Sequence, residues 1–184
     1  MLTPSHFLDL GNRATVDTVL RRLRQAGTIR RLARGIYDYP KSHVRLGLLS
    51  PSPDAVAQAI AQSEAIRLQP SGAYAVNLLG LSQQVPAQIV YLTDGAEKTV
   101  KIGRQMIRLR RTTPKNMATA GTASGLVIQA FRYLGQDGVT PDHIATLRGT
   151  LSAEDRKKLW KDRVHAPAWM HRHFDAVRGE DGES

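Results

Sequence analysis

The sequence predicts an α+β protein with a small N-terminal winged helix-turn-helix domain and a larger mixed α/β C-terminal domain. In the first 45 residues, two helical patterns precede two strand-like runs, and nine Lys or Arg stand against three Asp. Further along, helical patterns mix with β-branched runs, as is typical of a mixed domain. Pro51 and Pro53 interrupt the chain between these parts. We therefore place the domains at residues 1–48 and 52–178.

The first two predicted helices are short and lie close together along the chain. Thr3 can cap a helix that carries Phe7 and Leu10, and Gly11 can end it. Asn12 can cap a second helix that ends before Gly27. The apolar side chains of this second helix share one stripe, which comprises Val16, Val19, Leu20 and Leu23.

A basic β-hairpin is predicted directly after the second helix. Residues 29–32 and 36–39 form two strand-like runs around a three-residue loop that ends in Gly35. Strict alternation fails at Arg31 and Leu32, so we expect a β-bulge there. Two helices and a hairpin in this order are typical of a winged helix-turn-helix, whose second helix enters the major groove of DNA.

The polar face of the second helix and the hairpin carry side chains suited to duplex DNA. Arginine can contact guanine edges, Asn and Gln can pair with adenine, and hydroxyl groups can hold phosphates. The alternative is an amphipathic helix with solvated arginines, but the basic hairpin beside it favours DNA binding. The predicted DNA-binding residues are Asn12, Arg13, Thr15, Thr18, Arg21, Arg22, Gln25, Arg30, Arg31 and Arg34.

The second domain is predicted to mix helices and strands. The helices are expected at residues 53–64, 72–79, 122–134, 141–147, 152–162 and 167–177. The strands are expected at 66–68, 89–93, 98–102 and 105–112, the last two forming a hairpin. Gly80 should end the second of these helices, and Asp94 with Gly95 should form a turn.

A second basic segment lies at residues 98–115, which hold seven Lys or Arg and no carboxylate. It can be a second anion-binding surface, or a charged edge that prevents strand-to-strand aggregation, and both interpretations remain open. The surface residues in question are Lys98, Lys101, Arg104, Arg108, Arg110 and Arg111. As an alternative function, this hairpin could serve a nucleic-acid- or nucleotide-acting enzyme as a phosphate clamp, with Asp94 or Glu97 supporting metal-dependent turnover.

The overall composition favours a nucleic-acid partner and no catalytic role. The formal net charge is +10, which points to a polyanionic partner. Cysteine is absent, and no apolar run approaches the length of a membrane span, so we expect a cytoplasmic protein. His165, His171 and His173 lack the spacing of a zinc-binding helix, and no nucleophile motif is present. We therefore expect neither metal nor cofactor, and no enzyme.

Five segments carry motifs that point to a known family, at residues 7–13, 19–23, 27–40, 70–81 and 85–95, and the part from 70 to 95 is the most specific. Together they resemble AbiEi-type antitoxins of type IV toxin–antitoxin (abortive infection) systems. Members of that family usually carry a further helix before Thr3, and this sequence starts without it.

The resemblance implies a DNA-binding autorepressor. In that family a winged helix binds inverted repeats in the promoter of its own operon, and the C-terminal domain counters a nucleotidyltransferase-like toxin. Direct contact with the toxin is not implied. We accordingly expect double-stranded DNA as the partner, no membrane association, and a monomer in solution that pairs on DNA.

Overall fold

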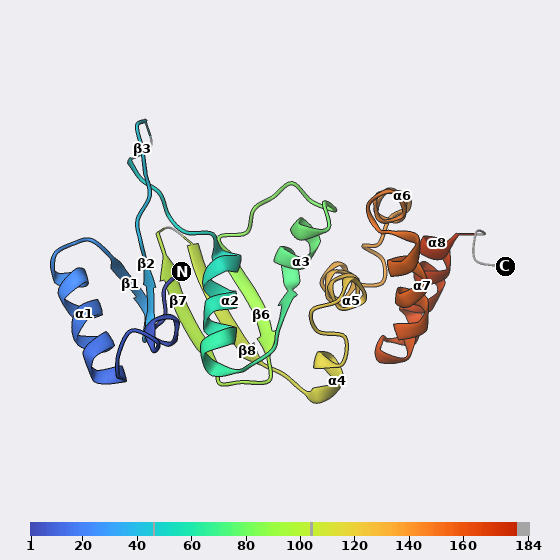
Figure 1. The fold of residues 1–184 in the computed structure, drawn as a ribbon. Coiled ribbons are helices and arrows are strands. Elements are labelled where there is room, and N and C mark those ends of the chain that lie inside the picture. Colours follow the sequence, from blue (N-terminus) through green and yellow to red (C-terminus); the bar gives the residue numbers. More distant parts are fainter. Residues whose placement is uncertain (46, 104, 180–184) are drawn as a thin grey trace. The chain divides into compact units, whose positions relative to one another are not determined.

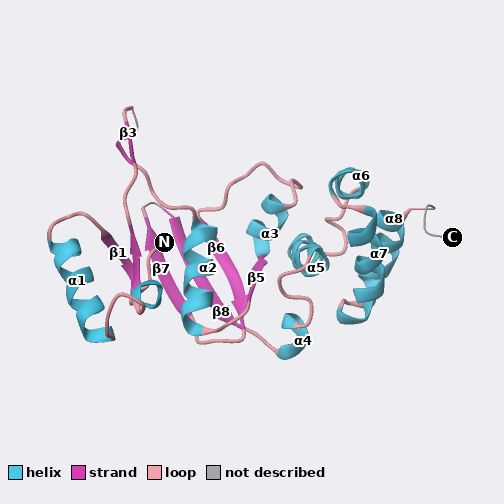
Figure 2. Cartoon of the chain, viewed as in Figure 1, coloured by secondary structure: helices cyan, strands magenta, loops and turns pink. Residues whose placement is uncertain are grey.

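A computed structural model describes residues 1–45, 47–103 and 105–179 of the chain, and it has the expected α+β class (Figures 1 and 2). The backbone divides into two compact units. Unit 1 comprises Met1–Ile66 and Lys98–Arg108, and unit 2 comprises Arg67–Glu97 and Leu109–Ser184.

Unit 1 combines two principal helices with short strands. Its elements are the 3₁₀ helix η1 (Pro4–Phe7), α1 (Arg13–Gln25), β1 (Arg30–Ala33), β2 (Ile36–Asp38), β3 (Ser42–His43), β4 (Gly47–Leu48), α2 (Pro53–Glu64), β7 (Lys98–Ile102) and the beginning of β8 (Gln105–Arg111). The predicted start of α1 is confirmed, because the Asn12 side chain accepts a hydrogen bond from the backbone N–H of Thr15 at 3.0 Å. The predicted end is also confirmed, with Gly27 in the left-handed region.

The first predicted helix is only a single 3₁₀ turn, and the apolar stripe of α1 is only partly buried. Val16 and Leu20 are buried with Ile29 in a small cluster. Val19 and Leu23 remain 47% and 36% exposed. The stripe is incompletely covered because η1 is too short to bury all of it.

The β1–β2 hairpin agrees with the sequence prediction in detail. The strands are antiparallel, and their register shifts between Arg31 and Ala33, which confirms the expected bulge. Gly35 adopts a positive φ of 72° in the connecting turn. A second hairpin, β3–β4, was not predicted from the sequence, and it projects from unit 1 in Figure 1.

The division into units differs from the expected boundary at residues 48–52. Helix α2 has its predicted bounds, with Ser52 as N-cap and Pro53 in the first turn, but it belongs to unit 1. Val56 and Ile60 are fully buried, and α2 packs against β2. The prolines therefore mark the start of a helix, whereas the compact unit is assembled from two separate stretches of chain.

Unit 2 contains a sheet region and a helical region. Its elements are β5 (Leu68–Ser71), α3 (Gly72–Leu78), β6 (Gln88–Thr93), the end of β8, α4 (Pro114–Met117), α5 (Ala123–Leu134), α6 (Pro141–Thr150), α7 (Ala153–Lys161), η2 (Asp162–His165), η3 (Ala168–Met170) and α8 (His171–Arg178). Within this unit β6 lies between β5 and the end of β8, and it pairs with β5 in antiparallel register. Most predicted elements are confirmed; β5 falls later than the expected strand at 66–68, and α4 was not predicted.

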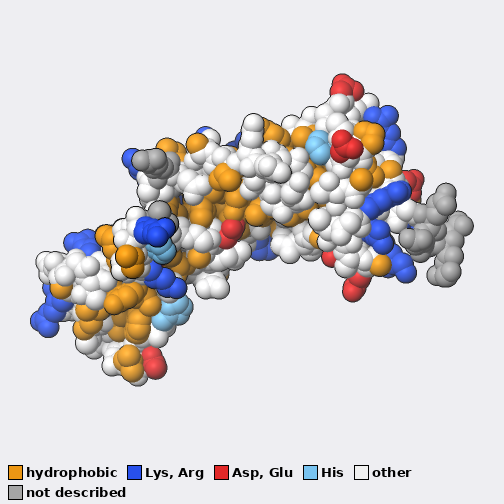
Figure 3. All heavy atoms as spheres, turned by 90° about the horizontal axis from the view of Figure 1, so that it is seen from above, with side chains coloured by type: hydrophobic (Ala, Val, Ile, Leu, Met, Phe, Trp, Pro, Cys, Tyr) orange, Lys and Arg blue, Asp and Glu red, His pale blue; other side chains and the backbone are white. Residues whose placement is uncertain are grey.

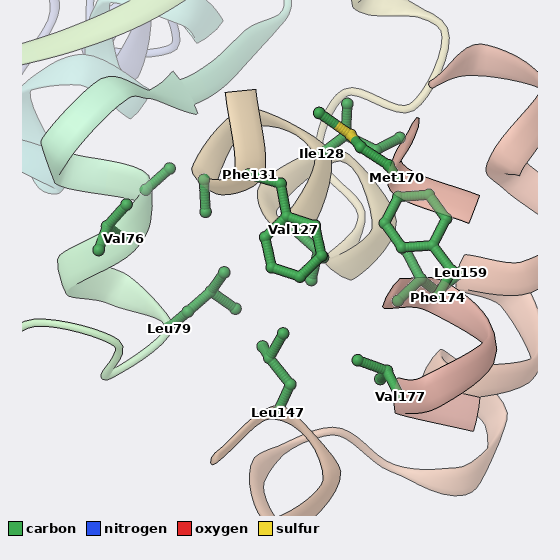
Figure 4. Packing of buried hydrophobic residues seen from close by; sticks show 12 residues of the cluster. Val76, Leu79, Val127, Ile128, Phe131, Leu147, Leu159, Met170, Phe174 and Val177 are labelled. Atoms are coloured by element: carbon green, nitrogen blue, oxygen red, sulfur yellow. The ribbon is translucent and has the colours of Figure 1, made fainter. Parts of the chain in front are cut away.

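The core of unit 2 is formed by α3, α5, α6, α7 and α8 (Figure 4). Phe131 of α5 stacks on Phe174 of α8, with 5.9 Å between ring centroids. Leu147 and Leu159 bring α6 and α7 into the same cluster. This aromatic pair lies at the centre of the cluster, and aliphatic side chains fill the remaining space.

Two helical glycines should respond oppositely to substitution by alanine. A Cβ at Gly125 in α5 would lie 2.2 Å from the Thr119 carbonyl oxygen and 2.5 Å from Gln69 Oε1, whereas a Cβ at Gly149 in α6 would meet nothing within 4 Å. We expect Gly125→Ala to lower the free energy of unfolding by about 1–3 kcal/mol through overpacking. Gly149→Ala should raise it by up to about 1 kcal/mol through helix propensity. Urea denaturation followed by circular dichroism measures both, and equal effects would contradict the close approach at Gly125.

Candidate nucleic-acid interface

One face of α1 carries a row of charged side chains. Arg13, Asp17, Arg21 and Arg24 follow one another at intervals of four, four and three residues, which places them on one side of the helix. The buried Val16 and Leu20 lie on a neighbouring side and hold the helix against Ile29. The rotation of α1 about its axis is therefore set by this small apolar contact.

The charged face of α1 forms one wall of an open cleft of about 750 Å³ in unit 1. The β1–β2 hairpin contributes Arg31, Arg34 and Tyr37 to the lining, and the end of α2 contributes Ser63 and Glu64. Five arginines from two elements thus line a single cleft. Blue Lys and Arg side chains are visible on the surface of this part of the chain, together with exposed apolar side chains (Figure 3).

The carboxylates of the cleft are already paired, whereas most of its arginines are not. Asp17 accepts hydrogen bonds from Arg13 Nε at 3.1 and 3.2 Å, and Glu64 forms an ion pair with Lys98. In the described chain, Arg21, Arg24 and Arg34 have no ion-pair partner. The cleft consequently carries uncompensated positive charge, which suits a phosphate backbone.

Arg30 differs from the other arginines of the hairpin. Its Nε donates to Asp38 at 2.8 Å across the β1–β2 pair, and its terminal nitrogen donates to the Leu49 carbonyl. Asp38 is buried, so this ion pair holds the two strands together and ties the following segment to them. The structure gives Arg30 this internal role, although it was expected to contact DNA.

The remaining predicted contacts of α1 do not line the cleft. Asn12 and Thr15 are engaged in the helix cap, with 3.0 Å between Asn12 Oδ1 and Thr15 Oγ1, and the Thr18 hydroxyl donates to the Ala14 carbonyl at 2.9 Å. Arg22 and Gln25 are exposed but do not line the cleft. The cleft thus brings together only part of the predicted set.

Arg24 was missed from the sequence, although it lines the cleft. Its spacing of three residues from Arg21 could have revealed it, because positions i and i+3 share a helix face. Thr3, Ser5 and Glu64 were missed as well. They come from segments far apart along the chain, and no local pattern connects them.

The second basic segment is not one uniform surface. Lys98 is paired with Glu64, while Lys101 and Arg108 are exposed in unit 1. Arg110 and Arg111 are exposed in unit 2, and Arg110 lines a separate pocket. Arg104 lies outside the described residues.

Asp94, a candidate for metal-dependent chemistry, has a structural partner. Its two carboxylate oxygens accept hydrogen bonds from the backbone N–H and from Nε of Arg67, both at 2.8 Å. The hydrogen bonds of Arg67 lower the pKa of Asp94 below its usual value. Asp94 therefore joins the turn after β6 to the residue that precedes β5.

The C-terminal histidines contact protein groups. His173 lies edge-on to Phe131 and Trp169, at 5.8 and 6.0 Å between ring centroids, and His171 Nε2 lies 3.0 Å from the Arg163 carbonyl. Burial, and secondarily the charge of Arg172, lowers the pKa of His173. Across residues 1–45, 47–103 and 105–179, no group of three or more His, Asp or Glu is placed to hold a metal ion.

One protein family matches most of the chain. A family described as "Family of unknown function (DUF6088)" matches residues 1–159, which include every residue of the arginine cleft. The protein belongs to this family. No curated protein and no solved structure matches this chain significantly. Among the described helices, none has the length and apolar character needed to cross a membrane.

Low pH should weaken the ion pair and hydrogen bonds between the Asp94 carboxylate and Arg67. Because the folded-state pKa of Asp94 is lowered, the carboxylate contributes stability above its unfolded pKa of about 4, and this contribution is lost as pH falls through the lower folded value. Asp94→Asn should therefore lower the free energy of unfolding at pH 7. Below about pH 4, this free energy should fall less steeply with decreasing pH in the variant than in the wild-type protein. Chemical denaturation across this pH range tests the role, and an Asp94→Asn variant with unchanged stability at pH 7 would count against it.

Proposed function

We propose that the protein is a sequence-specific DNA-binding autorepressor, and that it acts as the antitoxin of a type IV toxin–antitoxin system in the cytoplasm. The observation that carries the DNA-binding part is the convergence of Arg13, Arg21, Arg24, Arg31 and Arg34 on one cleft. The resemblance of residues 7–13, 19–23, 27–40, 70–81 and 85–95 to AbiEi-type antitoxins supports the antitoxin part.

The arrangement of α1 and the β1–β2 hairpin suits a winged helix-turn-helix mode of binding. The exposed side of a helix supplies arginines that can reach base edges or phosphates, and the adjacent hairpin adds Arg31 and Arg34 as contacts to the flanking backbone. Arg30 supports this arrangement indirectly, because its ion pair with Asp38 holds the hairpin together. Pairing of two copies on an inverted repeat would provide a second half-site.

DNA from immediately upstream of the gene should bind on the order of a thousandfold more tightly than random duplex at physiological salt. Base-specific contacts favour one sequence, whereas phosphate contacts act on every duplex. Fluorescence anisotropy titrations with labelled duplexes of equal length measure the ratio. Equal affinities for the two duplexes would defeat the proposed repressor role.

Substitutions on two faces of α1 separate the cleft from general basic charge. Arg21→Ala and Arg24→Ala should each weaken binding to the upstream DNA by about 1–3 kcal/mol, because both line the cleft. Arg22→Ala removes the same charge from a face outside the cleft, and it serves as the matched control with a smaller effect. Arg34→Ala, a phosphate contact, should weaken all duplexes alike and reduce the salt slope by about one. Equal losses for Arg22, Arg21 and Arg24 would show that only net charge matters.

The antitoxin part is tested separately in cells. Co-expression with a nucleotidyltransferase-like toxin encoded beside the gene should restore growth, and the Arg21→Ala variant should still restore it, because the C-terminal part is proposed to counter the toxin. Growth arrest that the wild-type protein does not relieve would refute this role and leave DNA binding to be judged by the titrations.

A further inference from the structure

Unit 2 contains an open pocket of about 310 Å³ that the proposed DNA contacts do not use. It lies between the sheet and α5, with the β5–α3 junction and α4 contributing to its rim. The volume falls in the range of pockets that hold small molecules. The lining residues are Ser71, Gly72, Val90, Leu92, Arg110, Thr112, Asn116, Gln129, Arg132 and Tyr133.

The spacing of these residues explains why their side chains meet. Val90 and Leu92 alternate along β6 and so lie on one face of the sheet. Arg110 and Thr112 have the same two-residue spacing at the end of β8, where the Thr112 N–H donates to the Thr93 carbonyl of β6 at 3.0 Å. The residues contributed by α5 have offsets of zero, three and four, which place them on one side of that helix; they are Gln129, Arg132 and Tyr133.

The pocket is cationic and has no carboxylate in its lining. Within the described part of the chain, neither Arg110 nor Arg132 has an ion-pair partner. Arg132 instead donates to Asn116 Oδ1 at 2.6 Å, and Asn116 Nδ2 donates to Thr112 Oγ1 at 2.8 Å. This chain of neutral groups orients a guanidinium without neutralising it. Partial burial lowers the pKa of Arg132, but an arginine remains charged at neutral pH.

Gln129 adds a neutral polar group to the pocket. The residue is only 5% exposed and it lines the pocket. A side-chain amide can both donate and accept hydrogen bonds, so Gln129 can contact a polar edge of a ligand bound there.

The remaining walls suit a flat, partly apolar group. Val90 and Leu92 supply aliphatic surface, and Tyr133 is more than half exposed at the pocket, where its ring can stack on another ring. Gly72, with a φ of 62°, leaves space beside Tyr133, since a Cβ there would lie 3.8 Å from the ring. Amide side chains such as Gln129 can hydrogen-bond to the edge of a nucleobase.

We propose that this pocket binds a free mononucleotide, with the phosphate held by Arg110 and Arg132 and the base placed beside Tyr133 and Gln129. The two guanidinium groups and the Thr112 hydroxyl supply the donors that a phosphate requires. The site is formed by unit 2 alone and is separate from the arginine cleft of unit 1.

Calorimetric titration of the full chain with adenosine, guanosine, cytidine and uridine 5′-monophosphates tests this site. At least one should bind saturably below roughly millimolar concentration, and inorganic phosphate should bind about tenfold or more weakly because it lacks the ring. Arg110→Gln and Arg132→Gln should each weaken nucleotide binding about tenfold or more through loss of a charge-assisted contact. Arg111→Gln, which changes the neighbouring exposed residue outside the pocket, should leave binding within about twofold.

Three outcomes of the titrations would each overturn the proposal. The first is that none of the four nucleotides binds saturably, and the second is that inorganic phosphate binds as tightly as the best nucleotide. The third is that Arg111→Gln loses as much nucleotide affinity as the two pocket variants. Nucleotide addition should also shift the side-chain amide resonances of Gln129 in the wild-type protein, and unchanged resonances at saturation would overturn the assignment. Duplex DNA binding measured on Arg132→Gln keeps this proposal separate from the repressor role, which depends on Arg21 and Arg24.

Discussion

The contact that determines the surface chemistry of unit 1 is the narrow apolar attachment of α1. Only Val16 and Leu20 of this helix are buried, and they pack with Ile29 next to the hairpin. This attachment sets the rotation of α1 about its axis, so that Arg21 and Arg24 line the cleft while Arg22 lies outside it. A small buried apolar contact thus decides which arginines of α1 line the cleft and which do not.

Paired and unpaired charges have different roles in the two units. Arg30 with Asp38 and Arg67 with Asp94 join segments of backbone, whereas Arg21 and Arg34 lack a carboxylate partner in the parts of the chain described by the structure. Surface ion pairs add little stability on average, but they remove cations from the set available to an anionic ligand. The count of 26 Lys and Arg therefore overstates the number of cations that are available to bind anions.

The two proposed anion sites are built in different ways. The cleft of unit 1 is larger and is lined by long, exposed arginines, as suits an extended polyanion. The pocket of unit 2 is smaller, and it combines two arginines with neutral amides, a hydroxyl and an aromatic ring, as suits a compact ligand with both charged and flat parts. A protein with both sites would join DNA binding to recognition of a small molecule in one chain.

Local features were determined by the sequence alone: the Asn12 cap, the bulge after Arg31, the bounds of α2 and most elements of unit 2. Caps, turns and periodicity depend on residues a few positions apart, so they can be read directly from the chain. Only the tertiary structure revealed the assignment of α2 to unit 1, the internal role of Arg30, and the meeting of β6, β8 and α5 around a pocket. Such arrangements depend on which long-range packing buries the most apolar surface, and no local pattern records that choice.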